Sequence, residues 1–396
     1  MRVDADDFAR PCSCGREHHI DVKEIVIESG AIGKLEEEMS DGDLREYISP
    51  LLICDTNSYK ATEELMEDIY DRCQVLILDA EGLEADDRAV EIVENYMEED
   101  IDLVLAVGAG TIHDLSRFVA HQYRIPFVSV PTAASSDGFT STVAASAPLF
   151  VFADTDIFAK APKRLTAAGV SDILGKYIAL ADWKIASILS EEYYCAEVVN
   201  LETRAVRTVK DNLKEIAAGE EEACEKLMYA LVLSGLAMQM TGSSRPASGA
   251  EHHLVHLWDM EVVNGHLDAL HGEKVSGGTM LVLLEYKKIA DAIRRGTCKV
   301  HTCTEEDQEL LKETFGKKGI LGALEKENTP EPLDDVSTRE LSDALPRILK
   351  IIDALPAVTD MQEMMNTAGC VSRVRDIGLP GEVIEESLLL APYTRR

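Results

Sequence analysis

The feature that most constrains the fold is an alternation of short apolar runs with amphipathic stretches along the first third of the chain. The runs, rich in Val, Ile and Leu, lie at residues 22–27, 51–55, 75–79, 102–107 and 127–130. Between them, residues 61–70, 86–97 and 111–122 repeat apolar side chains every three or four positions, which is typical of helices. This alternation predicts βαβ units in a parallel, doubly wound sheet, whose ligands bind beyond the carboxyl ends of the strands.

The second half of the chain has a different pattern. Long stretches at residues 171–189, 192–217, 222–240 and 276–294 are rich in helix-forming Ala, Leu, Glu and Lys, whereas residues 325–338 have the composition of a loop. We therefore predict an α/β protein in which a doubly wound parallel-sheet domain at residues 1–165 is followed by a mainly α-helical domain at residues 166–396.

Charge limits the range of partners. The 39 Lys and Arg residues against 72 Asp and Glu residues give a net charge of −33, which argues against a nucleic-acid or anionic-membrane surface. No run approaches the roughly 18 apolar residues of a membrane span, and the first ten residues lack the apolar core of a secretory signal. Nine irregularly spaced cysteines fit reduced thiols better than a disulfide framework, so we expect a cytoplasmic protein.

Two motifs beside predicted strands could bind a dinucleotide. Gly108 and Gly110 follow a buried strand and open a helix, where backbone N–H groups can approach a pyrophosphate; a simple tight turn is the alternative. Asp55 ends another strand, and its carboxylate could accept hydrogen bonds from a ribose or cap the following helix.

A third segment, residues 131–141, is a loop of small hydroxylated residues around a single acid, Asp137. Such loops are usually turns, but its place after a strand also suits a ligand. The segment Cys12-Ser13-Cys14 with His18 and His19 could be a metal knuckle, although it offers only four candidate ligands, two of them adjacent, and the sequence does not decide its role.

The strongest local signal is a cluster of histidines. Five of the ten histidines lie within residues 252–271, and His252 and His256 share one helix face while His253 points elsewhere. His271 comes from a separate segment. Two imidazoles with one carboxylate would form a three-ligand catalytic metal site with open positions; the alternative is ordinary surface or core histidines.

Five segments, in this order, resemble the sn-glycerol-1-phosphate dehydrogenase family, in the superfamily of glycerol dehydrogenase, iron-type alcohol dehydrogenases and dehydroquinate synthase. They span residues 108–114, 131–138, 171–176, 249–252 and 270–273. His113 stands where Asn is common in the family, and Ala109 where Ser or Gly is common. Neither departure removes a backbone donor.

The resemblance implies a dehydroquinate synthase-like enzyme of two domains with the active site in the cleft between them. It assigns Asp172, His252 and His271 as metal ligands, and Asp137, Asp172 and His256 as substrate-binding residues, with Asp172 and His256 in catalytic roles. The dinucleotide contacts would come from Asp55, Gly108, Ala109, Gly110, Thr111, Ile112, Thr132, Ser135 and Ser141.

The implied reaction transfers hydride between NAD(P)H and C2 of dihydroxyacetone phosphate. NAD and NADP both remain open as cofactor, and the divalent metal would be zinc or nickel, with iron less favoured. Relatives are usually homodimers or larger homo-oligomers. Three alternatives are a glycerol or other polyol dehydrogenase, a non-haem iron oxygenase and a non-catalytic acidic binding protein. Lys163, Arg164, Lys176 and Arg245 are candidates for binding a substrate phosphate.

Overall fold

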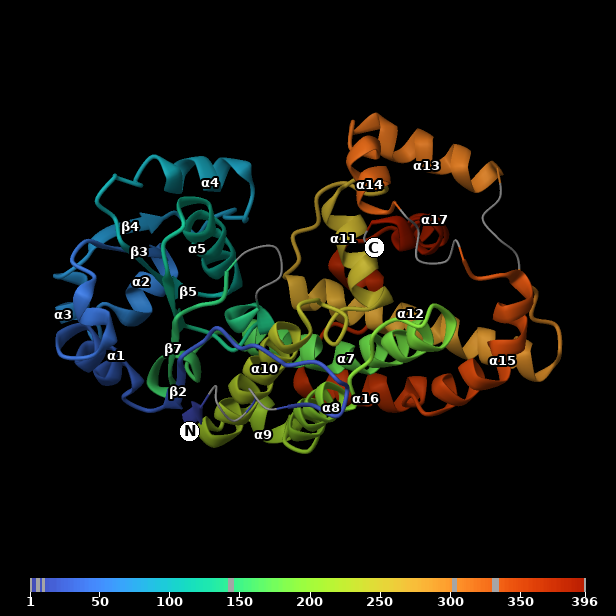
Figure 1. Cartoon of the computed structure of the whole chain (residues 1–396), viewed down its shortest axis with the longest axis horizontal. Coiled ribbons are helices and arrows are strands. Elements are labelled where there is room, and N and C mark those ends of the chain that lie inside the picture. Colours follow the sequence, from blue (N-terminus) through green and yellow to red (C-terminus); the bar gives the residue numbers. More distant parts are fainter. Residues whose placement is uncertain are drawn as a thin grey trace. The chain divides into compact units, whose positions relative to one another are not determined.

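The computed structural model describes residues 2–4, 8, 11–141, 146–300, 305–329 and 335–394. The first part of the chain forms a seven-stranded sheet in the order β1-β2-β7-β6-β5-β3-β4, and among the strands of the described residues only β1 is antiparallel to its neighbour. Figure 1 labels most of these strands. The strands are β1 (Arg2–Asp4), β2 (Glu24–Glu28), β3 (Pro50–Asp55), β4 (Gln74–Leu78), β5 (Leu103–Gly108), β6 (Phe127–Pro131) and β7 (Phe150–Asp154). The predicted α/β class is therefore confirmed.

Side chains of the central strands point alternately to the two faces of the sheet and pack into two apolar cores, one on each face. Leu52 and Leu105 belong to the core with α1 (Ala31–Ser40), whereas Leu51 and Val104 belong to the core with α4 (Asp87–Glu94) and α5 (Gly110–Tyr123). Short helices α2 (Thr56–Thr62), α3 (Glu67–Tyr70) and α6 (Thr155–Phe158) complete the connections. Because both faces of the sheet are covered, the sequences of these strands are continuous apolar runs.

The rest of the chain is mainly helical, as predicted. The long helices are α7 (Lys163–Leu189), α8 (Ala196–Lys210), α10 (Glu221–Thr241), α12 (His271–Arg294) and α15 (Thr338–Asp353). Shorter ones are α9 (Leu213–Ala218), α11 (Ala250–Asp259), α13 (Glu305–Lys317), α14 (Leu321–Glu327), α16 (Val358–Ala368) and α17 (Ile384–Leu390). Short 3₁₀ turns, among them η3 (Asp137–Thr140), join several elements.

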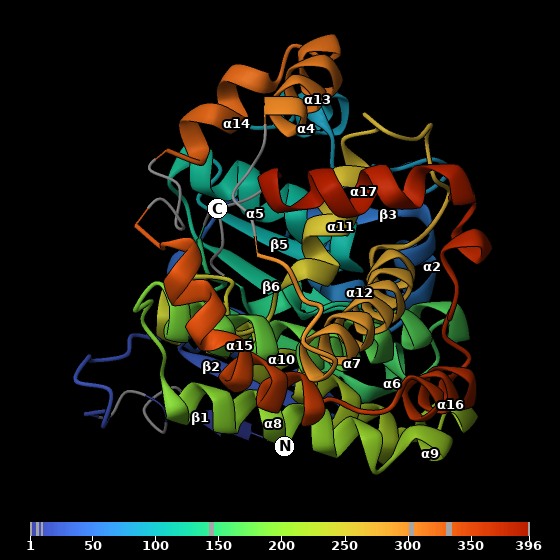
Figure 2. The ribbon, with the colours of Figure 1, turned by 90° about the vertical axis from the view of Figure 1, so that its right-hand side faces the viewer.

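Contacts divide the chain into two compact units, Met1–Ile173 with Glu197–Ser244, and Leu174–Ala196 with Arg245–Arg396. These units differ from the expected division at 165/166, because α10 packs against β2, α6 and η3 and so belongs with the sheet. In the second unit, α12 packs against α11, α15 and α16. Figure 2 shows α12, α11 and the sheet strands β3, β5 and β6 from the side.

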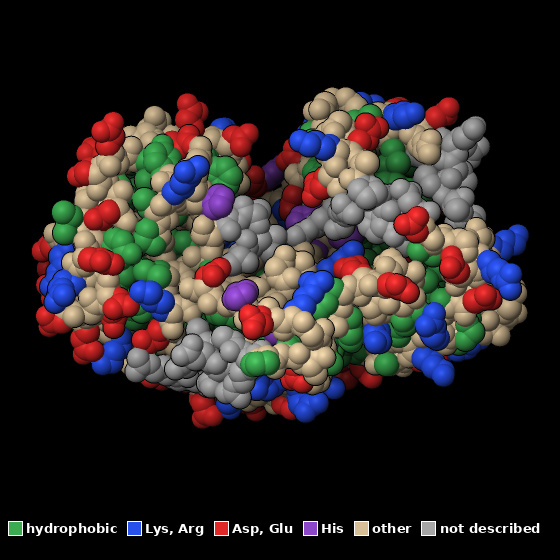
Figure 3. Space-filling model, in the orientation of Figure 1, with side chains coloured by type: hydrophobic (Ala, Val, Ile, Leu, Met, Phe, Trp, Pro, Cys, Tyr) green, Lys and Arg blue, Asp and Glu red, His purple; other side chains and the backbone are tan. Residues whose placement is uncertain are grey.

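Acidic side chains are spread over the face drawn in Figure 3 and alternate with Lys and Arg, rather than gathering in one patch. Among the described residues, none of the helices is both long and apolar enough to cross a bilayer.

Candidate active site

The ends of three neighbouring strands, β3, β5 and β6, lie side by side at the carboxyl edge of the sheet. Gly108 of β5 pairs with Pro131 of β6, and Asp55 of β3 lies one residue beyond the pair Cys54 and Val107. The chain passes from β3 outward to β4 and then returns to β5 on the other side of β3, so β3 and β5 flank the point where the strand order reverses. Such a switch point is where doubly wound sheets bind ligands.

The turn between β5 and α5 contains two glycines, and steric crowding explains the need for one of them, Gly108. A Cβ at Gly108 would lie 2.6 Å from the side chain of Ile112, which any larger residue would have to displace. At Gly110 a Cβ would meet only Ser136, at an ordinary 3.8 Å. The N-cap residue, Ala109, makes no side-chain cap, so backbone N–H groups open this helix. An anion would find a favourable partial positive charge there.

The structure gives Asp55 the role of a helix cap, one of the two readings its sequence allows. Its Oδ1 accepts hydrogen bonds from the backbone N–H groups of Asn57 at 2.8 Å and Ser58 at 2.9 Å. The carboxylate remains half-buried at the end of β3, so the cap fixes its position at the sheet edge.

Two side chains of α5 are structural rather than exposed to a ligand. His113 is fully buried between the carbonyl of Ala109 and the hydroxyl of Ser129, at 2.9 and 2.8 Å, and burial lowers its pKa to about 3. Arg117, which the sequence reasoning missed, donates from a nearly buried guanidinium to the carbonyl of Gly138. A basic residue two turns into a helix after a glycine motif carries no pattern that would have selected it.

The loop after β6 is held over the sheet by buried partners. Thr132 donates its backbone N–H to the carbonyl of Gly108 at 2.9 Å, and the hydroxyl of Ser141 donates to the sulfur of Met238 at 3.7 Å. Thr132, Ser135 and Ser141 are all buried. A Cβ at Gly169 would collide with the carbonyl of Ala134, so α7 passes directly against the loop.

Asp137 stands at the centre of a buried polar network. Its Oδ2 accepts from the hydroxyl of Ser234 at 2.8 Å, and that hydroxyl lies 3.0 Å from Glu202 Oε1. The backbone N–H of Asp137 donates to Asp172 Oδ2 at 2.9 Å. The loop therefore positions one expected substrate-binding acid and orients the carboxylate of an expected metal ligand.

The structure brings the three expected metal ligands together. Ligand atoms of Asp172, His252 and His271 lie within 4.8 Å of one another. Asp172 is fully buried on α7, which runs on without a break through Leu174, where the second unit begins. His252 is buried on α11, and His271 is exposed as the first residue of α12, with 5.3 Å between the two ring centroids.

A buried acid orients the first imidazole. Nδ1 of His252 lies 2.7 Å from Glu251 Oε1, which also accepts the backbone N–H of Gly249 at 2.9 Å. Because an ionised carboxylate only accepts, Nδ1 carries the proton and Nε2 has the lone pair that a metal needs. Glu251 is fully buried, and its position next to His252 in the sequence was the only available signal.

A second buried acid supports the start of α11. Asp182 accepts the backbone N–H of Ala250 at 2.7 Å and the hydroxyl of Tyr286. Burial, reinforced by the nearby charge of Glu251, raises the pKa of Asp182 to about 7. The close packing of α12 against α11 needs a small residue at position 278, since a Cβ there would lie 2.8 Å from the carbonyl oxygen of Glu251.

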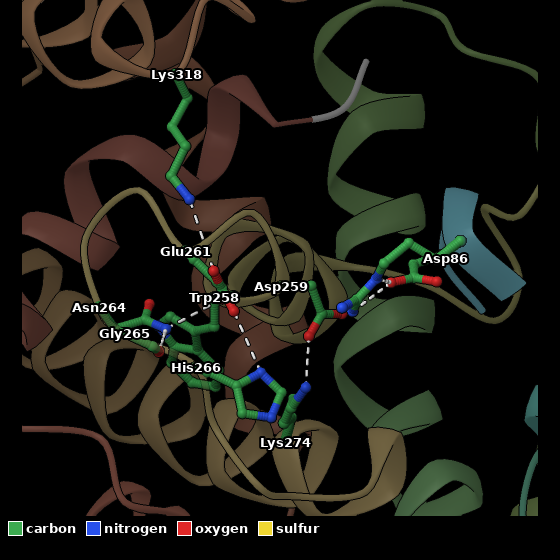
Figure 4. Close-up of polar contacts among 10 residues, drawn as sticks. Asp86, Trp258, Asp259, Glu261, Asn264, Gly265, His266, Lys274 and Lys318 are labelled. Carbon is green, nitrogen blue, oxygen red and sulfur yellow. Dashed lines mark hydrogen bonds and ion pairs between the residues drawn. The ribbon is translucent and has the colours of Figure 1, made fainter. Parts of the chain in front are cut away.

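The remaining histidines of the cluster lie outside this trio. His253 and His256 are half-buried on α11, and His256 follows His252 by one helical turn. His266 is exposed and pairs with Glu261 at 3.2 Å, while Lys318 approaches the other oxygen of Glu261 at 3.6 Å (Figure 4).

The candidate phosphate-binding cations have different environments. Lys163 donates to the carbonyl of Ala217 at 3.2 Å, and Arg245 pairs with Glu192 at 2.7 Å. Arg164 is exposed, whereas Lys176 is fully buried one turn after Asp172 on α7.

Comparison with known proteins shows which family this chain belongs to. A glycerol-1-phosphate dehydrogenase [NAD(P)+] of Geobacillus stearothermophilus is 32% identical over 96% of this chain and 92% of its own length. The chain belongs to the glycerol-1-phosphate dehydrogenase family. A second glycerol-1-phosphate dehydrogenase [NAD(P)+], from Halalkalibacterium halodurans, is 32% identical over 97% of this chain and 92% of its own length.

Broader matches agree with membership of the glycerol-1-phosphate dehydrogenase family. The iron-containing alcohol dehydrogenase family matches residues 26–162. A glycerol dehydrogenase structure from Schizosaccharomyces pombe covers 90% of this chain and 93% of its own, at 21% identity and a TM-score of 0.54, which shows a shared fold. The resemblance read from five sequence segments is thus confirmed.

Proposed function

We propose that this chain is a metal-dependent glycerol-1-phosphate dehydrogenase that transfers hydride between NAD(P)H and C2 of dihydroxyacetone phosphate. The observation that carries the proposal is the full-length similarity to relatives bearing that name, combined with the grouping of Asp172, His252 and His271.

The donor set fits a divalent cation. Two imidazoles and one carboxylate suit zinc, nickel or iron, and three protein ligands leave positions for a substrate. Glu251 Oε1, 2.7 Å from His252 Nδ1, supplies the orienting carboxylate that metal-binding histidines usually have. We favour zinc or nickel over iron. When bound, the cation polarises the C2 carbonyl as a Lewis acid, and the nicotinamide supplies the hydride.

The proposed dinucleotide site is the carboxyl edge of β3, β5 and β6. Gly108, Ala109, Gly110, Thr111 and Ile112 would present backbone donors to the pyrophosphate, and Thr132, Ser135 and Ser141 would line the same edge. Asp55 would accept a hydrogen bond from the adenosine ribose. Its negative charge disfavours a 2′-phosphate, so NAD is the better candidate of the two cofactors.

The proposed substrate groups surround the metal ligands. Asp172 would hold the reacting end of the substrate, with its carboxylate fixed by the backbone N–H of Asp137 at 2.9 Å. The side chain of Asp137 would contact a substrate hydroxyl. The imidazole of His256 would deliver the proton that the C2 oxygen gains on reduction, or contact the phosphate.

The test is NADH or NADPH oxidation by metal-loaded enzyme with dihydroxyacetone phosphate and, separately, with dihydroxyacetone. We expect turnover of the phosphate ester and a product that an sn-glycerol-3-phosphate dehydrogenase cannot oxidise. Turnover of dihydroxyacetone alone would favour a polyol dehydrogenase, and no turnover together with no NADH binding would favour a non-catalytic binding protein. Elemental analysis of the same sample identifies the metal.

We also propose that the enzyme works in the cytoplasm as a homodimer or larger homo-oligomer. The irregular, odd set of nine cysteines supports the compartment. Light scattering after size-exclusion chromatography tests the assembly, and a monomeric mass at micromolar concentration would contradict it.

A further inference from the structure

A second cluster of metal-ligating side chains lies at the N-terminal segment. Ligand atoms of Cys12, Cys14, His18 and Cys195 lie within 4.8 Å of one another. They come from two parts of the sequence that are far apart, so local chain geometry alone does not explain their meeting. We propose that these four residues form a structural zinc site, separate from the site of Asp172, His252 and His271.

The donor set is the first argument. Three thiols and one imidazole are the Cys₃His set of closed, tetrahedral zinc centres. Thiols are weak hydrogen-bond donors and acceptors, so hydrogen bonding gives little reason to gather three of them around one ring. Binding of one zinc ion would displace the thiol protons and join all four side chains.

The distances agree with that geometry. Zn–S bonds of about 2.3 Å and Zn–N bonds of about 2.05 Å, meeting at the tetrahedral angle, place a sulfur and a nitrogen about 3.6 Å apart. Cys14 Sγ and His18 Nε2 are 3.6 Å apart.

The imidazole is also oriented for a metal. Nδ1 of His18, which is 3% exposed, lies 2.5 Å from the carbonyl oxygen of Met240. Because a carbonyl only accepts, Nδ1 carries the proton, and the lone pair of Nε2 points to the side of Cys14. Most histidines that bind a metal donate their other ring N–H to a carbonyl or carboxylate in this way.

The backbone around the first two cysteines forms a tight knuckle. Gly15 donates its N–H to the carbonyl of Cys12 at 3.0 Å and adopts a positive φ of 83°, which favours glycine. An isolated antiparallel bridge between Pro11 and Glu17 closes the loop. Cys12 and Cys14 both lie inside the loop that this bridge closes.

The fourth ligand lies at the start of α8. Cys195 is fully buried and directly precedes this helix, which begins at Ala196. Met240 is the last residue but one of α10. With four protein ligands no position remains for a substrate, so the ion would tie the N-terminal segment to α8 and α10 rather than take part in catalysis.

Cobalt substitution tests the site, because thiolate ligands give Co²⁺ a sulfur-to-metal charge-transfer band in the near ultraviolet. The ligands Asp172, His252 and His271 include no sulfur and give no such band. Full-length protein is stripped with a chelator and reloaded anaerobically with Co²⁺. We expect the band in the wild type and in His271→Ala, and a loss of at least one third of its intensity in Cys195→Ser.

Cys224→Ser is the matched control, since Cys224 is a buried cysteine like Cys195 but lies outside the cluster. Zinc-loaded protein should hold two equivalents per chain in the wild type and in Cys224→Ser, and one in Cys195→Ser. If Cys195→Ser does not fold, the wild type is titrated with an organomercurial, which should release one zinc as three thiols react. Absence of the charge-transfer band, its persistence at full intensity in Cys195→Ser, or a disulfide among the three cysteines would overturn the proposal.

Discussion

Replacing Glu251 by Gln should weaken metal binding at the proposed active site without breaking the local fold. The amide oxygen can still accept the hydrogen bonds that Glu251 Oε1 takes from His252 Nδ1 at 2.7 Å and from Gly249 N–H at 2.9 Å. What disappears is the negative charge behind the imidazole, which makes Nε2 a better ligand.

The size of the effect follows from this difference. Loss of an outer-shell partner typically costs 10- to 100-fold in metal affinity, about 1.4 to 2.7 kcal/mol. Glu251→Gln keeps the geometry and turns a charge-assisted bond into a neutral one, so we expect about tenfold. Glu251→Ala removes both acceptors and should reach about 100-fold, with a further loss of about 1 to 3 kcal/mol in stability from the buried Gly249 N–H.

Competition with a chromophoric chelator measures the metal dissociation constant of each variant. Glu261→Gln is the control, because Glu261 also pairs with a histidine, His266, but the two side chains are 38% and 59% exposed and lie outside the trio. That variant should bind metal like the wild type. If Glu251→Gln also kept the wild-type affinity, or both variants lost it equally, the reasoning about the orienting carboxylate would be wrong.

Three further predictions concern the ligands, the glycine turn and a buried acid. His271→Ala and Asp172→Asn should each lose activity and one equivalent of bound metal relative to the wild type, measured by NADH oxidation and elemental analysis, with circular dichroism unchanged; a variant that keeps the wild-type metal content would be removed from the ligand set. Gly110→Ala should keep its melting temperature but bind NADH more weakly by fluorescence, whereas Gly108→Ala should lose about 1 to 3 kcal/mol of stability, because its Cβ would lie 2.6 Å from Ile112; equal stability of the two would contradict this. The pKa of Asp182 is about 7 in the folded chain and about 4 in the unfolded chain, so the free energy of unfolding falls as pH rises between these two values. The melting temperature of Asp182→Asn should therefore rise relative to that of the wild type as pH increases across this window. A difference in melting temperature that does not change with pH would refute the shift.

The sequence predicted the sheet core better than its margins. The five predicted strands correspond to β2 to β6, because runs buried on both faces leave a continuous apolar pattern. Strand β7 was not predicted, although its phenylalanines carry the signal. The expected helix at residues 61–70 was wrong in extent: α2 begins at Thr56, where Asp55 forms a capping box, and ends at Thr62, and α3 begins at Glu67.

Candidate site residues could be predicted where a sequence motif lies at the end of a helix or strand. They could not be predicted where only tertiary packing determines which residue reaches the site. His252 and His271 could be chosen from the histidine cluster, but Asp172 is one acid among 72 Asp and Glu residues, and only the family resemblance selected it. Arg117 and Asp182 act through contacts with distant backbone groups, Gly138 and Ala250, which no local spacing encodes.

The interleaving of the two units along the chain also sets an order for folding during synthesis. The first unit needs Glu197–Ser244, including α10 with its long buried face, yet Leu174–Ala196 of the second unit is made before it. The contacts of α10 with β2, α6 and η3 therefore cannot form until α10 has been synthesised, and residues 174–196 have to wait still longer for the rest of the second unit. A nascent chain of this kind should engage chaperones late in translation, and neither unit can be produced alone as one uninterrupted fragment.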